Sequence, residues 1–249
     1  IAFFSLNHVA QQPPEPKPAT APANEFSAER AHNLLQTLLA ENKPHPVGSP
    51  QNRVVKSRIT AELDRLSIGW EEQATWACAH RYNGCAFVEN IIAIIPGKSG
   101  DSFIALMAHY DSVPMAPGAG DDGAGVVAIL ESARALALEA PFEHSIMLLF
   151  TDAEEMGLIG AEGFFNQHPH AKKIKVVLDF EGSGTTGQSM VLRTTDGNEL
   201  LMNTLASETS SPFGFSFANE IFKRMPNDTD FSVVQRAGIS GIDFAFAGE

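Results

Sequence analysis

Short apolar runs of strand length alternate with segments of helical periodicity along most of the chain, and this alternation constrains the fold most strongly. The helical segments repeat apolar residues at three and four positions, whereas the strand-like runs are nearly continuous and β-branched. The expected helices lie at about 28–39, 51–66, 124–138, 200–207 and 230–236, and the expected strands at 88–95, 102–108, 145–150, 175–180 and 241–247. This order predicts an α/β protein whose sheet is covered by helices on both faces.

Composition excludes several classes of protein. The chain has 249 residues, 44% of them hydrophobic, which suits one large domain or two small ones with a sizeable core. It carries 17 Lys and Arg against 30 Asp and Glu, a formal net charge of −13. This acidic balance argues against a nucleic-acid partner. No apolar run reaches the roughly 18–20 residues that a membrane-spanning helix needs.

The first 24 residues differ from the rest. Residues 11–24 contain five prolines and little to bury, which predicts an extended, semi-rigid tether before a folded domain over residues 25–249. Residues 1–10 begin without Met and are interpreted either as the remnant of a membrane or signal segment or as an arbitrary boundary. Cys78 and Cys85 either form a disulfide in an oxidising compartment or are two unrelated thiols.

Acidic side chains or a histidine follow nearly every expected strand, at the edge where α/β sheets bind ligands. His109 and Asp111 are two positions apart, so both project to one side of extended chain, and the carboxylate can orient a metal-bound imidazole. Asp121 and Asp122 stand among glycines before a helix. We expect Asp122 or Gly123 to cap that helix, which leaves Asp121 to bind a metal.

Two further clusters end later strands. Glu154 and Glu155 are adjacent and cannot easily point to one spot, which indicates one metal ligand and one general base. Asp179 and Glu181 share one side of their strand, so spacing does not choose between them. Each cluster alone is typical of ordinary loops. Together they predict a metal site of His, Asp and Glu ligands that suits zinc and would accept manganese or cobalt.

Several segments carry a family likeness. AHYDSVP, GAGDDGAG, FTDAEEMGLIGAEGF, LDFEGSG and NDTDFSVVQRAGI occur in this order and resemble the family-28 metallopeptidases, the co-catalytic di-zinc aminopeptidases. PHPVGSPQN, which ends at Asn52, and VENIIAIIPG at 88–97 resemble the family's early segments. The likeness spans about residues 26–247 and is strongest to the membrane-associated vacuolar or endoplasmic-reticulum branch and its bacterial relatives. It implies a three-layer α/β/α sandwich with a mixed, mostly parallel central sheet.

The resemblance also implies roles for individual residues. It assigns His109 and Glu181 to the first zinc, Glu155 to the second, and Asp121 to a bridge between the two. Glu154 matches the general base, and Asp111 matches the acid that orients His109. Asp230 matches a supporting residue near the site.

The implied activity is hydrolysis of N-terminal peptide bonds, with a peptide bearing a free N-terminus as substrate. Family members carry a further zinc-binding histidine soon after the strand at 241–247, and this sequence ends at Glu249 without one. We therefore expect a truncated C-terminus, two zinc ions per full-length chain, and one or fewer ions with no activity in these 249 residues. The branch implies a membrane-anchored protein in an extracytoplasmic location, either periplasmic or lumenal.

Two alternatives remain at this point. A glutaminyl cyclase shares the HYDS and EE segments but uses one zinc, and Glu181 argues against it. A non-catalytic ectodomain would keep the fold as a binding surface, and the missing final histidine is its one support. Against it, the general base and every other expected zinc ligand remain, namely His109, Asp121, Glu154, Glu155 and Glu181.

Overall fold

The computed structural model describes residues 13–81, 83–182, 184–214 and 227–246, together with the single residues 220, 222, 224 and 248. The expected segment at 1–10 lies outside the described residues. No helix in the described part of the chain is both long and apolar enough to span a membrane.

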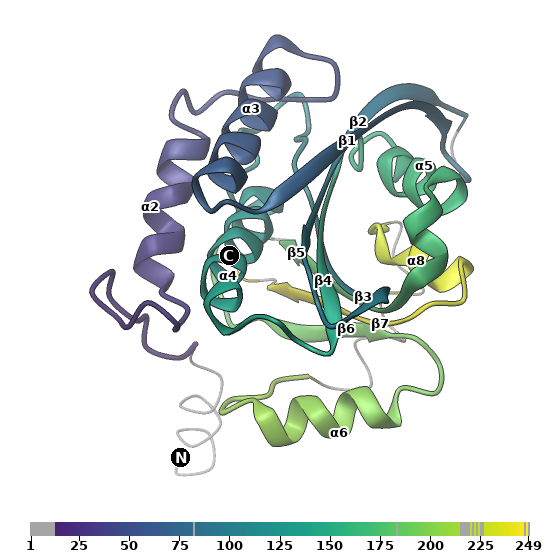
Figure 1. Cartoon of the computed structure of the whole chain (residues 1–249). Helices are drawn as coiled ribbons and strands as arrows, with labels where there is room; N and C mark the ends of the chain where they lie inside the picture. The colour runs from purple at the N-terminus through teal and green to yellow at the C-terminus, as the bar shows by residue number, and fades with distance from the viewer. Residues whose placement is uncertain are drawn as a thin grey trace, which may run out of the picture.

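The chain forms one mixed sheet with helices on both faces (Figure 1). The strands are β1 (Gly69–Cys78), β2 (Cys85–Ile95), β3 (Ser99–His109), β4 (His144–Thr151), β5 (Ile174–Gly182), β6 (Met190–Thr194) and β7 (Ser240–Phe246). The helices are α2 (Ala28–Leu38), α3 (Pro50–Arg65), α4 (Ala124–Glu139), α5 (Ile159–Gln167), α6 (Glu199–Glu208) and α8 (Phe231–Arg236). Every helix and strand that the sequence predicted is present, with boundaries shifted by up to three residues.

The strand order is β1-β2-β4-β3-β5-β7-β6. Strands β4, β3, β5 and β7 pair in parallel, whereas β1 with β2, β2 with β4, and β6 with β7 pair antiparallel. Five strands therefore run in one direction, and only β2 and β6 oppose them. This confirms the mixed, mostly parallel sheet. It also places the carboxyl ends of the four central strands at one edge.

Alternate residues of the central strands enter two separate cores. Leu106 and Ala108 of β3 face the layer of α2, α3 and α4, whereas Ala105 and Met107 face the layer of α5 and α8. Both faces of these strands are therefore buried, and for this reason their sequences are nearly continuous apolar runs. The two helix layers lie on opposite sides of the sheet (Figure 1).

Three of these strands and helices, β1, β6 and α5, were not predicted. β1 is an edge strand with many exposed and charged side chains, and β6 is a short edge strand, so neither produces a long apolar run. α5 contains Gly160 and Gly163, which weaken its helical pattern. Gly160 is required there, because a Cβ at this position would lie 2.1 Å from the backbone oxygen of Asp152.

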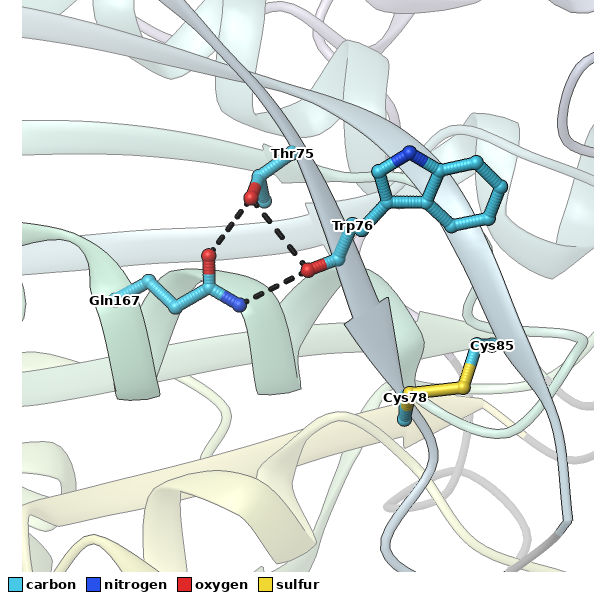
Figure 2. The surroundings of a disulfide bond; sticks show 5 residues. All are labelled: Thr75, Trp76, Cys78, Cys85 and Gln167. Atoms are coloured by element: carbon cyan, nitrogen blue, oxygen red, sulfur yellow. Dashed lines mark hydrogen bonds between the residues drawn. A yellow bond between two sulfur atoms is a disulfide. The ribbon is translucent and has the colours of Figure 1, made fainter.

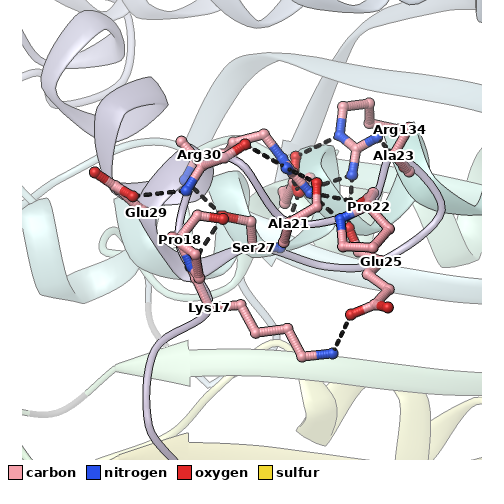
Figure 3. A network of polar contacts seen from close by, with 12 residues as sticks. Lys17, Pro18, Ala21, Pro22, Ala23, Glu25, Ser27, Glu29, Arg30 and Arg134 are labelled. Atoms are coloured by element: carbon pink, nitrogen blue, oxygen red, sulfur yellow. Dashed lines mark hydrogen bonds and ion pairs between the residues drawn. The ribbon is translucent and has the colours of Figure 1, made fainter.

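The proline-rich segment is not a free tether from Lys17 onward. It folds into turns over α2 and α4, as Figure 3 shows. Arg30 donates to the backbone oxygens of Ala19 at 2.7 Å, Ala21 at 2.9 Å and Glu25 at 2.7 Å. Arg134 donates to the Glu25 oxygen at 2.7 Å. The backbone of this proline-rich segment has few N–H donors, and two guanidinium groups satisfy its carbonyls instead.

The β1–β2 hairpin is closed by a disulfide between Cys78 and Cys85, which are directly opposite in the register (Figure 2). Gln167, at the end of α5, fastens the same hairpin: it accepts from the Thr75 hydroxyl at 2.7 Å and donates to the Trp76 carbonyl at 3.1 Å. Of the two possibilities that the sequence left open, a disulfide or two unrelated thiols, the structure has the disulfide.

Candidate metal centre

The predicted site residues meet at the shared carboxyl edge of the central strands. His109 is the last residue of β3, and Glu181 is the second-to-last residue of β5. The Glu154–Glu155 pair follows β4, in a chain reversal where Ala153 has a φ of 58°. Parallel strands thus bring together residues that are up to 72 positions apart in sequence.

His109 lies at the centre of the cluster and is fully buried. Its Nε2 is 2.9 Å from Asp121 Oδ1 and 3.8 Å from Glu181 Oε2. Its Nδ1 faces Asp111, at 3.1 Å from the backbone oxygen and 3.5 Å from Oδ1. Burial lowers the pKa of His109, but the hydrogen bonds to Asp111 and Asp121 outweigh burial and raise this pKa well above its ordinary value.

Asp111 connects His109 to the two glutamates. Its Oδ1 accepts a hydrogen bond from the backbone N–H of Glu154 at 2.9 Å, and its Oδ2 accepts one from Glu155 at 3.3 Å. A single buried carboxylate therefore orients an imidazole from β3 and fixes the turn after β4. Asp111 thus lies where a carboxylate can orient the imidazole of His109.

The two adjacent aspartates have separate environments. The sequence left Asp122 or Gly123 as the cap of α4. Gly123 occupies the N-cap position, and the buried Asp122 accepts from the Gly125 N–H at 3.0 Å through its Oδ1. The Asp121 side chain is half-exposed and reaches His109. Asp121 is thus the aspartate of the pair that is available to a metal.

Burial and crowding of like charges raise the pKa values of the acids around His109. Burial is the largest cause for each of them. The pKa of Glu155 rises to about 7 through burial and the nearby Asp121, and that of Asp152 rises to about 7 through burial and Asp111. Glu154 and Glu181 are raised well above their ordinary pKa values. A divalent cation would reverse these shifts, because it favours the charged carboxylates.

The donor set fits such a cation. One ligand atom each from His109, Asp121 and Glu155 lies within 4.8 Å of the other two, the one such group of three found among the described residues. One imidazole nitrogen and two carboxylate oxygens are ligands that zinc takes at about 2.0–2.2 Å. Glu181 lies beside His109, and Glu154 is held next to Glu155, so the arrangement leaves one carboxylate of the pair free for proton transfer.

Asp230 and Asp179 lie behind the cluster. Asp230 Oδ2 accepts a hydrogen bond from the hydroxyl of Thr151 at 2.5 Å, and Thr151 is the last residue of β4, shortly before Glu154 and Glu155. Asp179 is fully buried, and neither of its carboxylate oxygens has a hydrogen-bond partner. It pairs in register with Asp243, which accepts from Arg193 at 2.8 Å. Glu181, rather than Asp179, is the carboxylate that approaches His109.

Sequence reasoning missed several buried residues whose hydrogen bonds support the segments around the cluster. Asp152 Oδ1 accepts from the side chain of Asn52 at 3.1 Å, and the backbone N–H of His45 donates to the Ser112 hydroxyl at 2.8 Å. Arg193 is buried and donates to Ser232 and Thr229 as well as to Asp243. These partners are 36 to 100 residues apart in sequence, so no local pattern reveals the pairs.

A mixed sheet covered by helices on both faces, with a His, Asp and Glu cluster at its carboxyl edge, defines an α/β protein with a candidate metal site. The profile of peptidase family M28 matches residues 90–249, well over half of the chain. The chain belongs to peptidase family M28, a family of zinc-dependent peptidases.

Two relatives place the chain more closely. Endoplasmic reticulum metallopeptidase 1 of Mus musculus is 31% identical over 242 residues, which cover 89% of this chain and 27% of that protein. The vacuolar membrane protease of Eremothecium gossypii is 36% identical over 160 residues, 63% of this chain and 16% of that protein. The chain therefore spans about a quarter or less of the length of these curated relatives.

Solved structures share the fold. A glutaminyl cyclase from an Acidobacteriales bacterium has a TM-score of 0.71 at 20% identity and covers 94% of this chain and 85% of its own. BSAP, a zinc aminopeptidase from Bacillus subtilis, has a TM-score of 0.70 at 16% identity and covers 89% and 85%. At these identities the likeness shows the fold alone.

Proposed function

We propose that this chain is the catalytic domain of a zinc-dependent aminopeptidase that hydrolyses the first peptide bond of a substrate with a free N-terminus. One observation carries the proposal: His109, Asp121 and Glu155 converge within 4.8 Å, and Glu154 stands next to them as a buried carboxylate. A ligand cluster with an adjacent free carboxylate is the arrangement that metal-assisted hydrolysis requires.

His109 and Glu181 would hold one zinc, Glu155 a second, and Asp121 would bridge the two, with two ions per full-length chain. When bound, zinc polarises the scissile carbonyl and acidifies a water molecule. The carboxylate of Glu154 accepts a proton from the attacking water as the new C–O bond forms. As the C–N bond breaks, Glu154 delivers this proton to the departing amine. Burial keeps Glu154 out of bulk water.

The cellular setting is part of the proposal. The Cys78–Cys85 disulfide supports an oxidising compartment, and the relatives are named for the endoplasmic reticulum and the vacuolar membrane. We place the domain on the extracytoplasmic side of a membrane to which the full-length protein is attached.

The test compares the full-length protein with its Glu154→Gln variant, because we expect the 249 residues alone to be inactive. We expect both proteins to hold the same amount of zinc by elemental analysis. Hydrolysis of aminoacyl anilides should fall at least 100-fold in the variant, which is the usual scale for removing a general base. N-acetylated anilides serve as the control, since an aminopeptidase rejects a blocked N-terminus. Near-normal turnover by Glu154→Gln would contradict the role of Glu154.

A second function has one observation in its favour, the glutaminyl cyclase structures among the neighbours. Such an enzyme would convert an N-terminal glutaminyl peptide to the pyroglutamyl form and release ammonia, with no hydrolysis of anilides. Glu181 argues against it, because with His109, Asp121 and Glu155 it makes four candidate protein ligands, more than the three that a single catalytic zinc with one open position takes. Ammonia release from glutaminyl peptides, with no anilide cleavage, would establish the cyclase instead.

A further inference from the structure

The segment His45–Asn52 runs from the loop after α2 into the first turn of α3, and it has a buried polar side chain at each end. His45 is 2% exposed and Asn52 is 0% exposed. Neither side chain belongs to the metal-ligand set or to the general base. Each one contacts a different stretch of the chain that carries metal ligands.

His45 contacts the stretch that follows β3. Its backbone N–H donates to the Ser112 hydroxyl at 2.8 Å, and its backbone oxygen accepts from the Ser112 N–H at 3.4 Å. Its ring Nδ1 lies 3.3 Å from the Lys43 oxygen. The ring also lies under Gly118, where a Cβ would be 3.1 Å from His45 Cε1. The imidazole thus fills the space between the β3 exit and the turn to Asp121.

Asn52 contacts the turn that follows β4. Its Nδ2 donates to Asp152 Oδ1 at 3.1 Å, and the same Oδ1 accepts from the Ala153 N–H at 3.0 Å. Asp152 therefore fixes the start of the turn that presents Glu154 and Glu155. The Oδ1 of Asn52 is buried without a partner, which costs stability. Packing alone does not explain an amide here, whereas the contact with Asp152 does.

The backbone of the segment is restrained by two prolines and by the hydrogen bonds of Ser49. Pro46 and Pro50 restrict its backbone, and Asn52 lies in the first turn of α3. Ser49 donates to the Pro46 oxygen at 3.0 Å through its backbone, and its side chain accepts from the Asn52 N–H at 3.0 Å. Hydrogen bonds within the segment therefore link the Pro46 end to the Asn52 end.

We propose that His45–Asn52 is a brace that sets the spacing between the two ligand-bearing turns, with His45 and Asn52 as positioning residues for the metal centre. One turn carries Asp121 and the other carries Glu155, so the brace fixes how far apart these two carboxylates stand. The inference rests on the metal site of the proposed function and does not require that the chain hydrolyse peptides.

Zinc affinity is the measurement that tests the brace. We would compare the wild type with His45→Gln, Asn52→Ala and the double variant by competition with a chromogenic chelator. Each single change should weaken zinc binding about tenfold or more, as losses of the groups that orient ligands do. The double variant should lose less than the product of the two single effects, because either change already releases the spacing.

Ser27→Ala is the matched control. Ser27 caps α2 through the Arg30 N–H at 3.2 Å, and it contacts neither ligand-bearing turn. We expect this variant to lower the melting temperature without changing zinc affinity. If Asn52→Ala does not fold, Asn52→Ser replaces it, since a hydroxyl remains a hydrogen-bond donor but is too short to reach Asp152 directly.

The outcomes separate the brace from the proposed function. Wild-type zinc affinity in the brace variants, or an equal loss in Ser27→Ala, would overturn the brace alone. Zinc binding that weakens as expected in the brace variants, together with a full-length protein that cleaves no anilide, would overturn the aminopeptidase and leave the brace standing. A wild type that binds no zinc would overturn both.

Discussion

At the scale of single residues, Asp111 shows how one side chain organises the site. It faces the imidazole of His109 and accepts hydrogen bonds from the backbone of Glu154 and Glu155. In Asp111→Asn one of these backbone N–H groups would face an NH₂ group, so a bond would be replaced by a repulsive contact. We expect zinc affinity to fall about 10–100-fold.

Chelator competition measures this change as well. Asp64→Asn is its control, because it makes the same chemical replacement where Asp64 accepts a bond from exposed Trp70, remote from the site. The interpretation of Asp111 is wrong if Asp111→Asn binds zinc as tightly as Asp64→Asn does.

Sequence alone singled out the residues that converge in the structure better than the residues that hold them in place. His109, Asp121 and the Glu154–Glu155 pair were recognisable because each follows a strand or opens a helix, and ligand types at such positions stand out locally. Only the family resemblance implied which glutamate of the pair binds a metal. The choice of Glu181 over Asp179 needed the family resemblance, since both share one side of β5. Asn52 could not be assigned a role, because its partner Asp152 lies 100 residues away and only the fold joins them.

At the scale of elements, the β1–β2 hairpin depends on its disulfide. Cys78 and Cys85 are seven residues apart, so the bridge closes a short loop in the unfolded chain. Its removal in Cys78→Ser with Cys85→Ser should lower the free energy of unfolding by about 2 kcal/mol, because the open loop gains conformational entropy. Urea denaturation under non-oxidising and oxidising conditions measures the difference.

The reduced wild type is the reference for that variant. If the bridge acts through the unfolded chain, the reduced wild type and the double serine variant should unfold at the same urea concentration. An oxidised wild type that is no more stable than either would contradict the prediction.

The elements that the sequence predicted are those with a buried face. β3 and β4 are covered on both sides, so their apolar runs are unmistakable, whereas the edge strands β1 and β6 have no such run. α5 was hidden by two glycines, one of which is there because Asp152 approaches it closely. The contacts of the proline-rich stretch after Lys17 are hidden for a similar reason, since the guanidinium groups that bind its carbonyls come from α2 and α4.

At the scale of the whole molecule, the fold concentrates acids at one edge of the sheet, and this has a consequence for stability. Asp152, Glu155 and Asp230 each have a pKa raised to about 7, with burial as the largest cause. In an unfolded chain their pKa values return to about 4. Between these values the native state binds more protons than the unfolded state, so stability falls as pH rises.

We therefore expect the metal-free protein to lose stability between about pH 4 and pH 7, with no further loss from these groups above that range. Saturating zinc should reduce this loss, because the ion takes the place of protons on Glu155 and its affinity rises with pH. Melting temperatures across this range, with a chelator and with excess zinc, measure both effects. The decisive comparison is Asp230→Asn, in which the amide oxygen still accepts from Thr151 but the group no longer titrates. Its metal-free stability should fall less steeply with pH than that of the wild type, and an equal slope would show that the pKa of Asp230 is the same in the folded and the unfolded chain.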